Sequence, residues 1–73
     1  MKVFLKRKEV KKRLILKNKS QNWLANRLEI SSGYISQLMD GSRNPSPRLR
    51  RKILSTFPKS KFYDLFEIKD TGK

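Results

Sequence analysis

The chain has 73 residues, a formal net charge of +13 from 19 basic and 6 acidic residues, and neither cysteine nor histidine. This length allows one domain with a small core. The composition excludes disulfides, thiolate metal sites and the commonest general base, so we expect no enzyme, no cofactor and no bound metal.

The strongly basic balance is typical of a domain that binds nucleic acid. A solvated basic surface and an anionic membrane surface are the two alternatives. No apolar run approaches the roughly 18 residues that span a bilayer. The start, MKVFLKRKEV, has too short an apolar run for a signal peptide. We therefore expect a cytoplasmic protein, associated with the nucleoid if it binds DNA.

The two ends of the chain carry weak signals. The VFL stretch near the N-terminus suits either a short extended segment or the lead-in to a helix, and we expect residues 1–5 to be loose. Residues 69–73 are polar, and we expect a frayed tail there. The whole of 1–73 is predicted to be a single all-α domain, a compact bundle of four to five short helices.

The first helix is predicted over about residues 6–17, where the helix formers Lys, Arg, Glu and Leu dominate. Val10 and Leu14 fall four residues apart and form an apolar edge, which Ile15 and Leu16 are expected to widen. Any single lysine of this stretch is best interpreted as a solvated surface group. Together the basic side chains would add affinity for phosphates through counterion release.

Two short helices with a tight turn between them are predicted within residues 20–41. Ser20 and Ser31 are the expected N-caps, and Gly41 is expected to end the second helix in the left-handed conformation. The apolar residues at helical spacing are Leu24, Ala25 and Leu28 in the first helix and Ile35, Leu38 and Met39 in the second. This pattern predicts a helix-turn-helix, whose second helix can enter a DNA major groove.

Two further helices are predicted toward the C-terminus. Ser46 caps and Pro47 starts a helix over about 47–56, since proline's missing N–H costs nothing at a first helical position. Ser60 is the expected cap of a last helix over about 61–66. The apolar residues expected to face the core from this half are Leu49, Ile53, Phe57, Phe62, Leu65, Phe66 and Ile68.

The polar face of the second helix of the helix-turn-helix is the predicted base-contacting surface. At 100° per residue this face carries Ser32, Gly33, Ser36 and Gln37. Gln37 is the strongest candidate, because an amide can donate and accept together, as adenine's major-groove edge requires. The serines would discriminate weakly. Gly33 indicates either a close approach of the backbone to DNA or a loosely packed first turn.

Four side chains around that helix are predicted to contact phosphates, which fixes register and supplies affinity rather than sequence information. They are Gln21, Tyr34, Arg43 and Asn44. Gln21 lies at a helix start, where free backbone N–H groups also suit a phosphate oxygen. Tyr34 has a place in the core as its alternative. Arg43 and Asn44 directly follow the predicted recognition helix.

The stretch QNWLANRLEISSGYISQLMDGSRNPSP resembles the XRE family of lambda-repressor-like helix-turn-helix domains. The matching points are Gln21, Leu24-Ala25, Ile30-Ser31, Ile35-Ser36, Leu38, Gly41 and Arg43 to Pro45. The resemblance covers about residues 10–57. It implies a bundle of four or five helices, a prokaryotic or phage origin and operator binding, often as a dimer. It also implies a phosphate contact at Gln21 and base reading at Ser32, Gly33 and Gln37.

Two positions depart from that family's pattern. Glu29 stands where the family usually has glycine, and if the turn needs a positive φ, glutamate costs on the order of 1 kcal/mol. A reshaped turn is the alternative, and it would shift the recognition helix. Lys19 stands where the family is usually apolar, which predicts a looser corner between the first two helices.

Sequence-specific binding of double-stranded DNA by a small transcriptional regulator is thus the predicted function. The alternatives are an antitoxin, an excisionase-like or architectural DNA-binding protein, or a helix-turn-helix used for protein interaction or RNA. The sequence leaves open whether the chain forms a homodimer on a palindromic operator, for which the exposed part of FYDLFEI is a candidate surface. No small-molecule ligand is expected.

Overall fold

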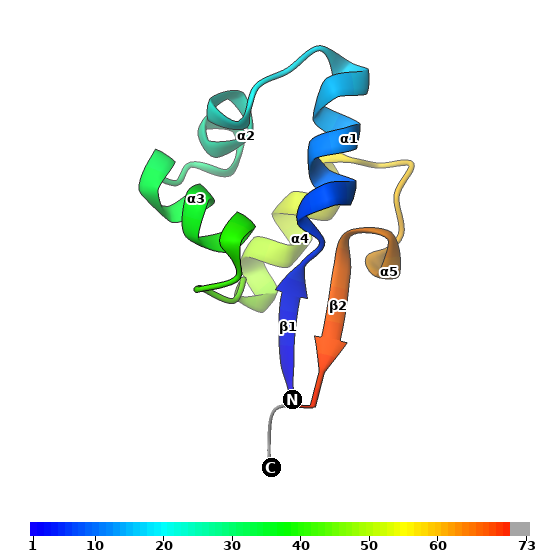
Figure 1. Cartoon of the computed structure of the whole chain (residues 1–73). Coiled ribbons are helices and arrows are strands. Elements are labelled where there is room, and N and C mark those ends of the chain that lie inside the picture. The colour runs from blue at the N-terminus through cyan, green and yellow to red at the C-terminus, as the bar shows by residue number, and fades with distance from the viewer. Residues whose placement is uncertain (71–73) are drawn as a thin grey trace.

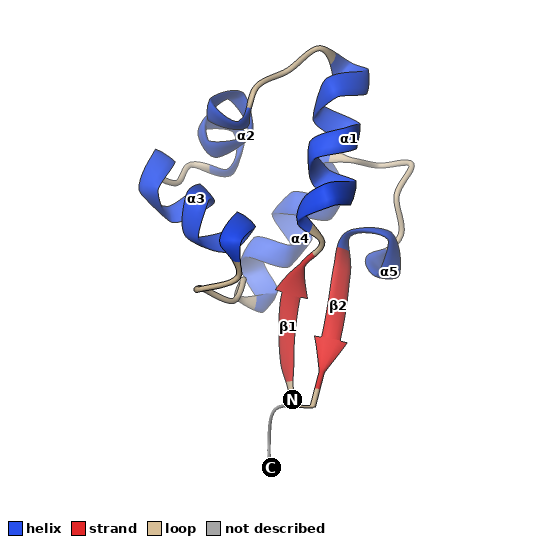
Figure 2. Cartoon of the chain, viewed as in Figure 1, coloured by secondary structure: helices blue, strands red, loops and turns tan. Residues whose placement is uncertain are grey.

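The computed structural model describes residues 1–70, in which five helices surround one core and a two-stranded sheet extends from it (Figure 1, Figure 2). The helices are α1 (Arg7–Lys17), α2 (Gln21–Leu28), α3 (Ser32–Asp40), α4 (Pro47–Thr56) and α5 (Phe62–Leu65), and the strands are β1 (Lys2–Leu5) and β2 (Phe66–Lys69). None of the helices in this part of the chain is long and apolar enough to cross a membrane.

The helix starts follow the predicted caps in three cases. The side-chain oxygens of Ser20, Ser31 and Ser46 each accept a hydrogen bond, at 3.0–3.2 Å, from the backbone N–H three residues further on. Each bond satisfies one of the donors that a helix start leaves unpaired. Gly41 ends α3 with a φ of 87°, as predicted. Local sequence therefore sets the limits of α2, α3 and the start of α4.

The core is built from residues of every helix and both strands. Its buried hydrophobic members are Leu5, Val10, Leu14, Leu24, Ala25, Leu28, Ile35, Leu38, Met39, Leu49, Ile53, Phe57, Leu65 and Phe66. The prediction that Ile15 and Leu16 widen the apolar edge of α1 is wrong, because these side chains are 72% and 73% exposed. Successive residues turn by about 100°, so only Val10 and Leu14 keep the inward direction.

The two ends of the chain form an antiparallel hairpin in space, and the all-α prediction is wrong in this part. β1 pairs with β2 so that Val3 lies opposite Ile68 and Leu5 opposite Phe66. Residues 2–5 are therefore not loose, because they hydrogen-bond to β2 and bury Leu5 in the core. Lys69 belongs to β2, and the remainder of the predicted frayed tail beyond residue 70 lies outside the described residues.

The last helix is shorter than predicted and has a different cap. α5 begins after Lys61, whose backbone N–H donates to Asp64 Oδ2 at 2.7 Å. The Ser60 hydroxyl instead accepts a hydrogen bond from Arg13 Nε at 2.7 Å. The chain turns into β2 at Phe66, so the predicted core residue Ile68 lies beyond the packed interior and is 42% exposed.

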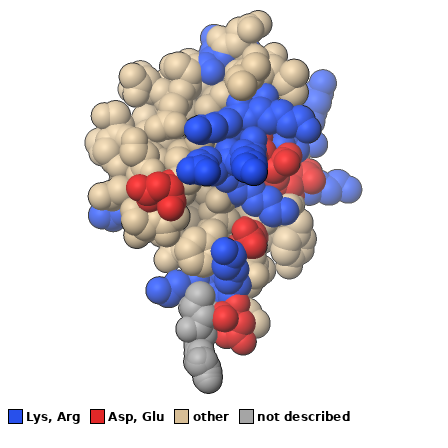
Figure 3. All heavy atoms as spheres, viewed as in Figure 1, with Lys and Arg blue, Asp and Glu red and all other residues tan. Residues whose placement is uncertain are grey.

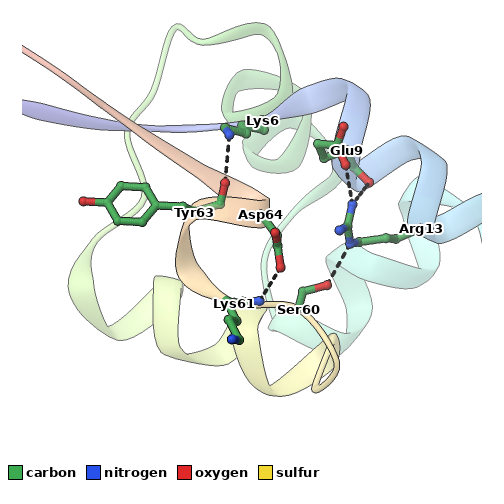
Figure 4. A network of polar contacts seen from close by, with 7 residues as sticks. All are labelled: Lys6, Glu9, Arg13, Ser60, Lys61, Tyr63 and Asp64. Carbon is green, nitrogen blue, oxygen red and sulfur yellow. Dashed lines mark hydrogen bonds and ion pairs between the residues drawn. The ribbon is translucent and has the colours of Figure 1, made fainter.

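Polar contacts tie α1 to the segment around α5 (Figure 4). Arg13 donates both to Glu9 Oε1 at 2.7 Å and to Ser60, so one guanidinium joins two elements. This hydrogen bond from Arg13 is the main reason that the pKa of Glu9 lies below its ordinary value. Lys6 Nζ donates to the Tyr63 carbonyl at 2.8 Å. These contacts hold α5 and the hairpin against α1.

Glu29, the residue at the corner between α2 and α3, has a left-handed backbone with φ 61° and ψ 41°. Of the two alternatives that the sequence left open at Glu29, the structure shows the positive φ and not a reshaped turn. The backbone N–H of Ile30 donates to the Ala25 carbonyl at 3.0 Å, which closes the helix end. The turn keeps the geometry that glycine would adopt without strain.

We expect Glu29→Gly to stabilise the fold by up to about 1 kcal/mol, because glycine adopts the left-handed conformation without a Cβ clash. The lost ion pair with Lys52, at 3.1 Å, contributes little because the Glu29 side chain is 80% exposed. Urea denaturation measures the change. Asn18→Gly is the matched control, since Asn18 has a similar φ of 58° but asparagine already tolerates it. An equal gain at both positions would contradict the explanation.

Candidate nucleic-acid interface

The α2–α3 pair presents α3 at the surface because the apolar sides of the two helices face each other. Leu24 and Leu28 on α2 and Ile35 and Leu38 on α3 are at most 1% exposed. Only residues 29–31 separate the helices, so the connection forces a sharp corner. In Figure 1, α3 lies at the outer side of the molecule, away from α5. Its other side is therefore accessible to a ligand.

The exposed face of α3 contains the four predicted base-contacting residues. Ser32, Gly33, Ser36 and Gln37 are all exposed, while Ile35, Leu38 and Met39 between and after them are buried. The face is polar and uncharged, and its first turn carries only small side chains. Small side chains at a helix start let another molecule approach the backbone closely.

Two of the predicted contact residues meet across the helix pair. Gln21, at the first position of α2, donates from Nε2 to Ser36 Oγ at 3.4 Å. This contact brings together one predicted phosphate contact and one predicted base contact that lie 15 residues apart in the chain. The start of α2 therefore borders the polar face of α3.

Arg43 joins two further predicted residues at the other end of that face. Its Nε donates to Gln37 Oε1 at 2.9 Å, and its guanidinium lies 4.7 Å from the centre of the Tyr34 ring. Tyr34 is half-buried and packs against the core. The alternative prediction for this residue, a place in the core, is therefore partly confirmed. The side-chain oxygen of Gln37, Oε1, has a second lone pair, so the side-chain amide can still accept a hydrogen bond as well as donate one.

Asn44 does not join this cluster. Its side-chain nitrogen donates to the Val3 carbonyl at 2.9 Å, and the residue is half-buried between the loop after α3 and β1. The prediction of a phosphate contact at Asn44 therefore gains no support, because this side chain holds the loop after α3 to strand β1. The sequence could not reveal this contact, since Val3 lies 41 residues away.

Gly33 has no packing reason within the described structure. A Cβ built at this position meets only Ser31 Oγ, at an ordinary distance of 3.9 Å. Its φ is not in the left-handed region, unlike that of Gly41. Glycine inside a helix costs roughly 1 kcal/mol relative to alanine, and nothing among residues 1–70 requires it here.

Two cations near α3 were not singled out individually from the sequence. Arg48, in the first turn of α4, lines a shallow hollow of about 200 Å³ together with Tyr34 and Lys52. Arg7, at the start of α1, acts electrostatically on Asp40 at the end of α3. Hydrogen bonds from Ser42 are the main cause of the lowered pKa of Asp40. In the sequence, Arg48 directly follows Ser46 and Pro47, which mark a helix start. This place in a first helical turn is the signal that could have identified Arg48 as a candidate phosphate contact.

The cations are unevenly distributed over the face of the molecule that Figure 3 shows. In the view of Figure 3, Lys and Arg gather at the centre and right of the molecule, and the left side, where Figure 1 places α2 and α3, is mostly uncharged. α1 alone contributes the basic residues Arg7, Lys8, Lys11, Lys12, Arg13 and Lys17. The polar face of α3 is therefore bordered by positive charge rather than covered by it.

Comparisons with protein-family models, with curated proteins and with solved structures found no match to this chain. Its function is therefore inferred from the chemistry of α3 and the groups around it.

Proposed function

We propose that this chain is a sequence-specific, double-stranded DNA-binding regulator of the small prokaryotic or phage type, and that α3 enters the major groove. The observation that carries the proposal is the exposed face of α3, made of Ser32, Gly33, Ser36 and Gln37, which is polar and uncharged and has only small side chains in its first turn. A major groove about 12 Å wide admits one helix, and small residues at the helix start allow close approach to base edges. The XRE-like stretch supports the same assignment.

In this proposal the residues around α3 divide into two sets. Ser32, Gly33, Ser36 and Gln37 contact bases, with Gln37 the main source of sequence preference. Gln21, Tyr34 and Arg43 contact phosphates beside them, and Arg48 joins this set because it lines the same shallow hollow as Tyr34. The basic residues of α1 raise the local potential and the association rate without reading sequence.

Selection of binding sites from random duplexes tests the proposal directly. We expect a short preferred sequence, and an affinity that falls steeply as the salt concentration rises, because released counterions drive the phosphate contacts. Salt-dependent binding without any preferred sequence would indicate an architectural role instead. No binding to duplex DNA at any salt concentration would overturn the proposal and favour a helix-turn-helix that binds protein or RNA.

Gly33→Ala separately tests whether DNA closely approaches the backbone of α3 at Gly33. We expect the variant to keep or increase its stability, by up to about 1 kcal/mol, because the added methyl group meets no close neighbour and alanine is the better helix former. We expect its affinity for the selected duplex to fall, because the methyl group occupies space needed by the DNA. Thermal denaturation and fluorescence anisotropy measure the two effects.

Gly41→Ala is the matched control for this experiment. Gly41 has a φ of 87°, so alanine is strained there and we expect a loss of stability on the order of 1–2 kcal/mol. If Gly33→Ala binds DNA as tightly as the unaltered chain, close backbone approach at Gly33 is wrong.

A further inference from the structure

A hollow of about 470 Å³ lies between the second half of α1 and the loop that joins α4 to α5. Its apolar lining comes from Leu16, Phe57 and Pro58, and we call it the α1 hollow. Its volume falls within the range of roughly 300–1,000 Å³ that is usual for ligand sites. Leu16 is 73% exposed, so a large aliphatic side chain at this hollow is in contact with water. Covering it with an apolar group of another molecule would be favourable.

Polar contacts hold the two sides of the α1 hollow in place. Arg13 Nε donates to Ser60 Oγ at 2.7 Å, which joins α1 to the loop after α4 (Figure 4). The backbone N–H of Ser60 donates to the Phe57 carbonyl at 2.9 Å, which closes the loop into a tight turn. The walls are thus formed before any ligand arrives, and a ligand loses little affinity to their ordering.

Three exposed cations border the same hollow. Lys12 and Lys17 line it from α1 and Lys59 lines it from the loop, whereas none of its lining residues is acidic. Lys12 acts electrostatically on Glu9. Within residues 1–70, however, none of the three ammonium groups has a hydrogen bond or an ion pair. The α1 hollow therefore combines an apolar lining with positive charge that no close carboxylate neutralises.

We propose that the α1 hollow docks an acidic segment of a partner protein, in which a large apolar side chain is flanked by aspartate or glutamate. The apolar side chain covers Leu16 and Pro58. The flanking carboxylates pair with Lys17 on the α1 side and with Lys59 on the loop side. Complementary charge of this kind steers a partner to its site and fixes its orientation. The interaction is additional to DNA binding and does not depend on it.

Shape and position favour a peptide over the other anionic partners of a basic protein. The backbone of a DNA duplex would use the cations, but it offers no apolar group to the lining. The loop that forms one wall also lies on the other side of the molecule from α3 in Figure 1, and Figure 3 shows Lys and Arg gathered on that side. A bilayer surface is flat on this scale, whereas a single side chain can enter a hollow of this volume.

A labelled synthetic peptide, EDELFEDE, provides the direct test by fluorescence anisotropy without DNA. We expect saturable binding that weakens as the salt concentration rises, because the ion pairs are at the surface and are screened. The peptide EDEAAEDE has the same charge but no large apolar side chain. We expect it to bind at least about tenfold more weakly, because it leaves the apolar lining exposed to water.

Two variants separate the contribution of charge from that of the apolar contact. Lys59→Glu should weaken EDELFEDE by about threefold to tenfold, because an attractive surface pair becomes a repulsive one. Leu16→Ala should weaken it by a similar factor although the charge of the chain is unchanged. Lys11→Glu is the matched control for net charge, because Lys11 lies on α1 but does not line the hollow. We expect it to change the affinity by less than about twofold.

Amide chemical shifts of the unaltered chain locate the bound peptide without any substitution. Addition of EDELFEDE should move the signals of residues 12–17 and 57–60 more than those of α3. Shifts centred on α3, equal binding of the two peptides, or an equal loss in Lys11→Glu and Lys59→Glu would each overturn the proposal. Binding to phosphatidylserine vesicles but not to EDELFEDE would also overturn it, in favour of a membrane surface. None of these outcomes bears on whether the chain binds duplex DNA.

Discussion

Phe66→Ala should remove most of the stability of the folded chain. Phe66 is fully buried at the start of β2, and its ring lies 5.0 Å from that of Phe62. Removing a buried phenylalanine costs about 3–5 kcal/mol through lost burial and the cavity left behind. A single small domain has only about 5–15 kcal/mol of stability in total, and one of this length belongs near the lower limit. The substitution therefore removes most of the free energy of unfolding.

Urea denaturation followed by circular dichroism measures this effect. Leu16→Ala is the matched control, because it removes an aliphatic side chain that is 73% exposed, and we expect a change within about 0.5 kcal/mol. If the two variants lose similar stability, the hairpin does not contribute to the core as the structure indicates. The comparison also tests the finding that Leu16 lies outside the apolar edge of α1.

Gln37→Ala and Arg43→Ala should have different effects on DNA binding, provided that α3 reads DNA. We expect Gln37→Ala to cost about 1–3 kcal/mol on the preferred duplex and to relax the choice of base at one position. Arg43→Ala should weaken binding to all duplexes and reduce the dependence on salt. The structure adds a coupling, because Arg43 Nε donates to Gln37 Oε1 and fixes its orientation. The double variant should therefore lose less than the sum of the single losses.

Fluorescence anisotropy with the preferred duplex, and with single-base variants of it, measures the affinities of the two single variants and of the double variant. Lys59→Ala is the control for a lost cation, because Lys59 lies in the loop between α4 and α5, on the other side of the molecule from α3 in Figure 1. A uniform loss of affinity for all duplexes in Gln37→Ala would show that Gln37 does not read a base. Strictly additive losses would show that the contact with Arg43 has no role in the complex.

Local patterns in the sequence determined most of the helical framework. The caps Ser20, Ser31 and Ser46 and the ending at Gly41 depend on hydrogen bonds and backbone angles within four residues, so they can be predicted from neighbouring letters. The polar and apolar faces of α3 follow from helical spacing alone. The resemblance to the XRE family, which usually has glycine at the position of Glu29, raised two alternatives for this turn, a strained positive φ or a reshaped turn. The structure shows the positive φ.

The pairing of distant segments was decided by the tertiary structure alone. β1 and β2 are four residues each and pair across more than sixty residues of chain, so neither carries a local signal strong enough to predict the hairpin. The same holds for Asn44, which contacts Val3, and for Ser60, which accepts from Arg13 instead of capping α5. A polar side chain near a loop has several candidate partners, and only the folded backbone brings one of them within hydrogen-bond distance.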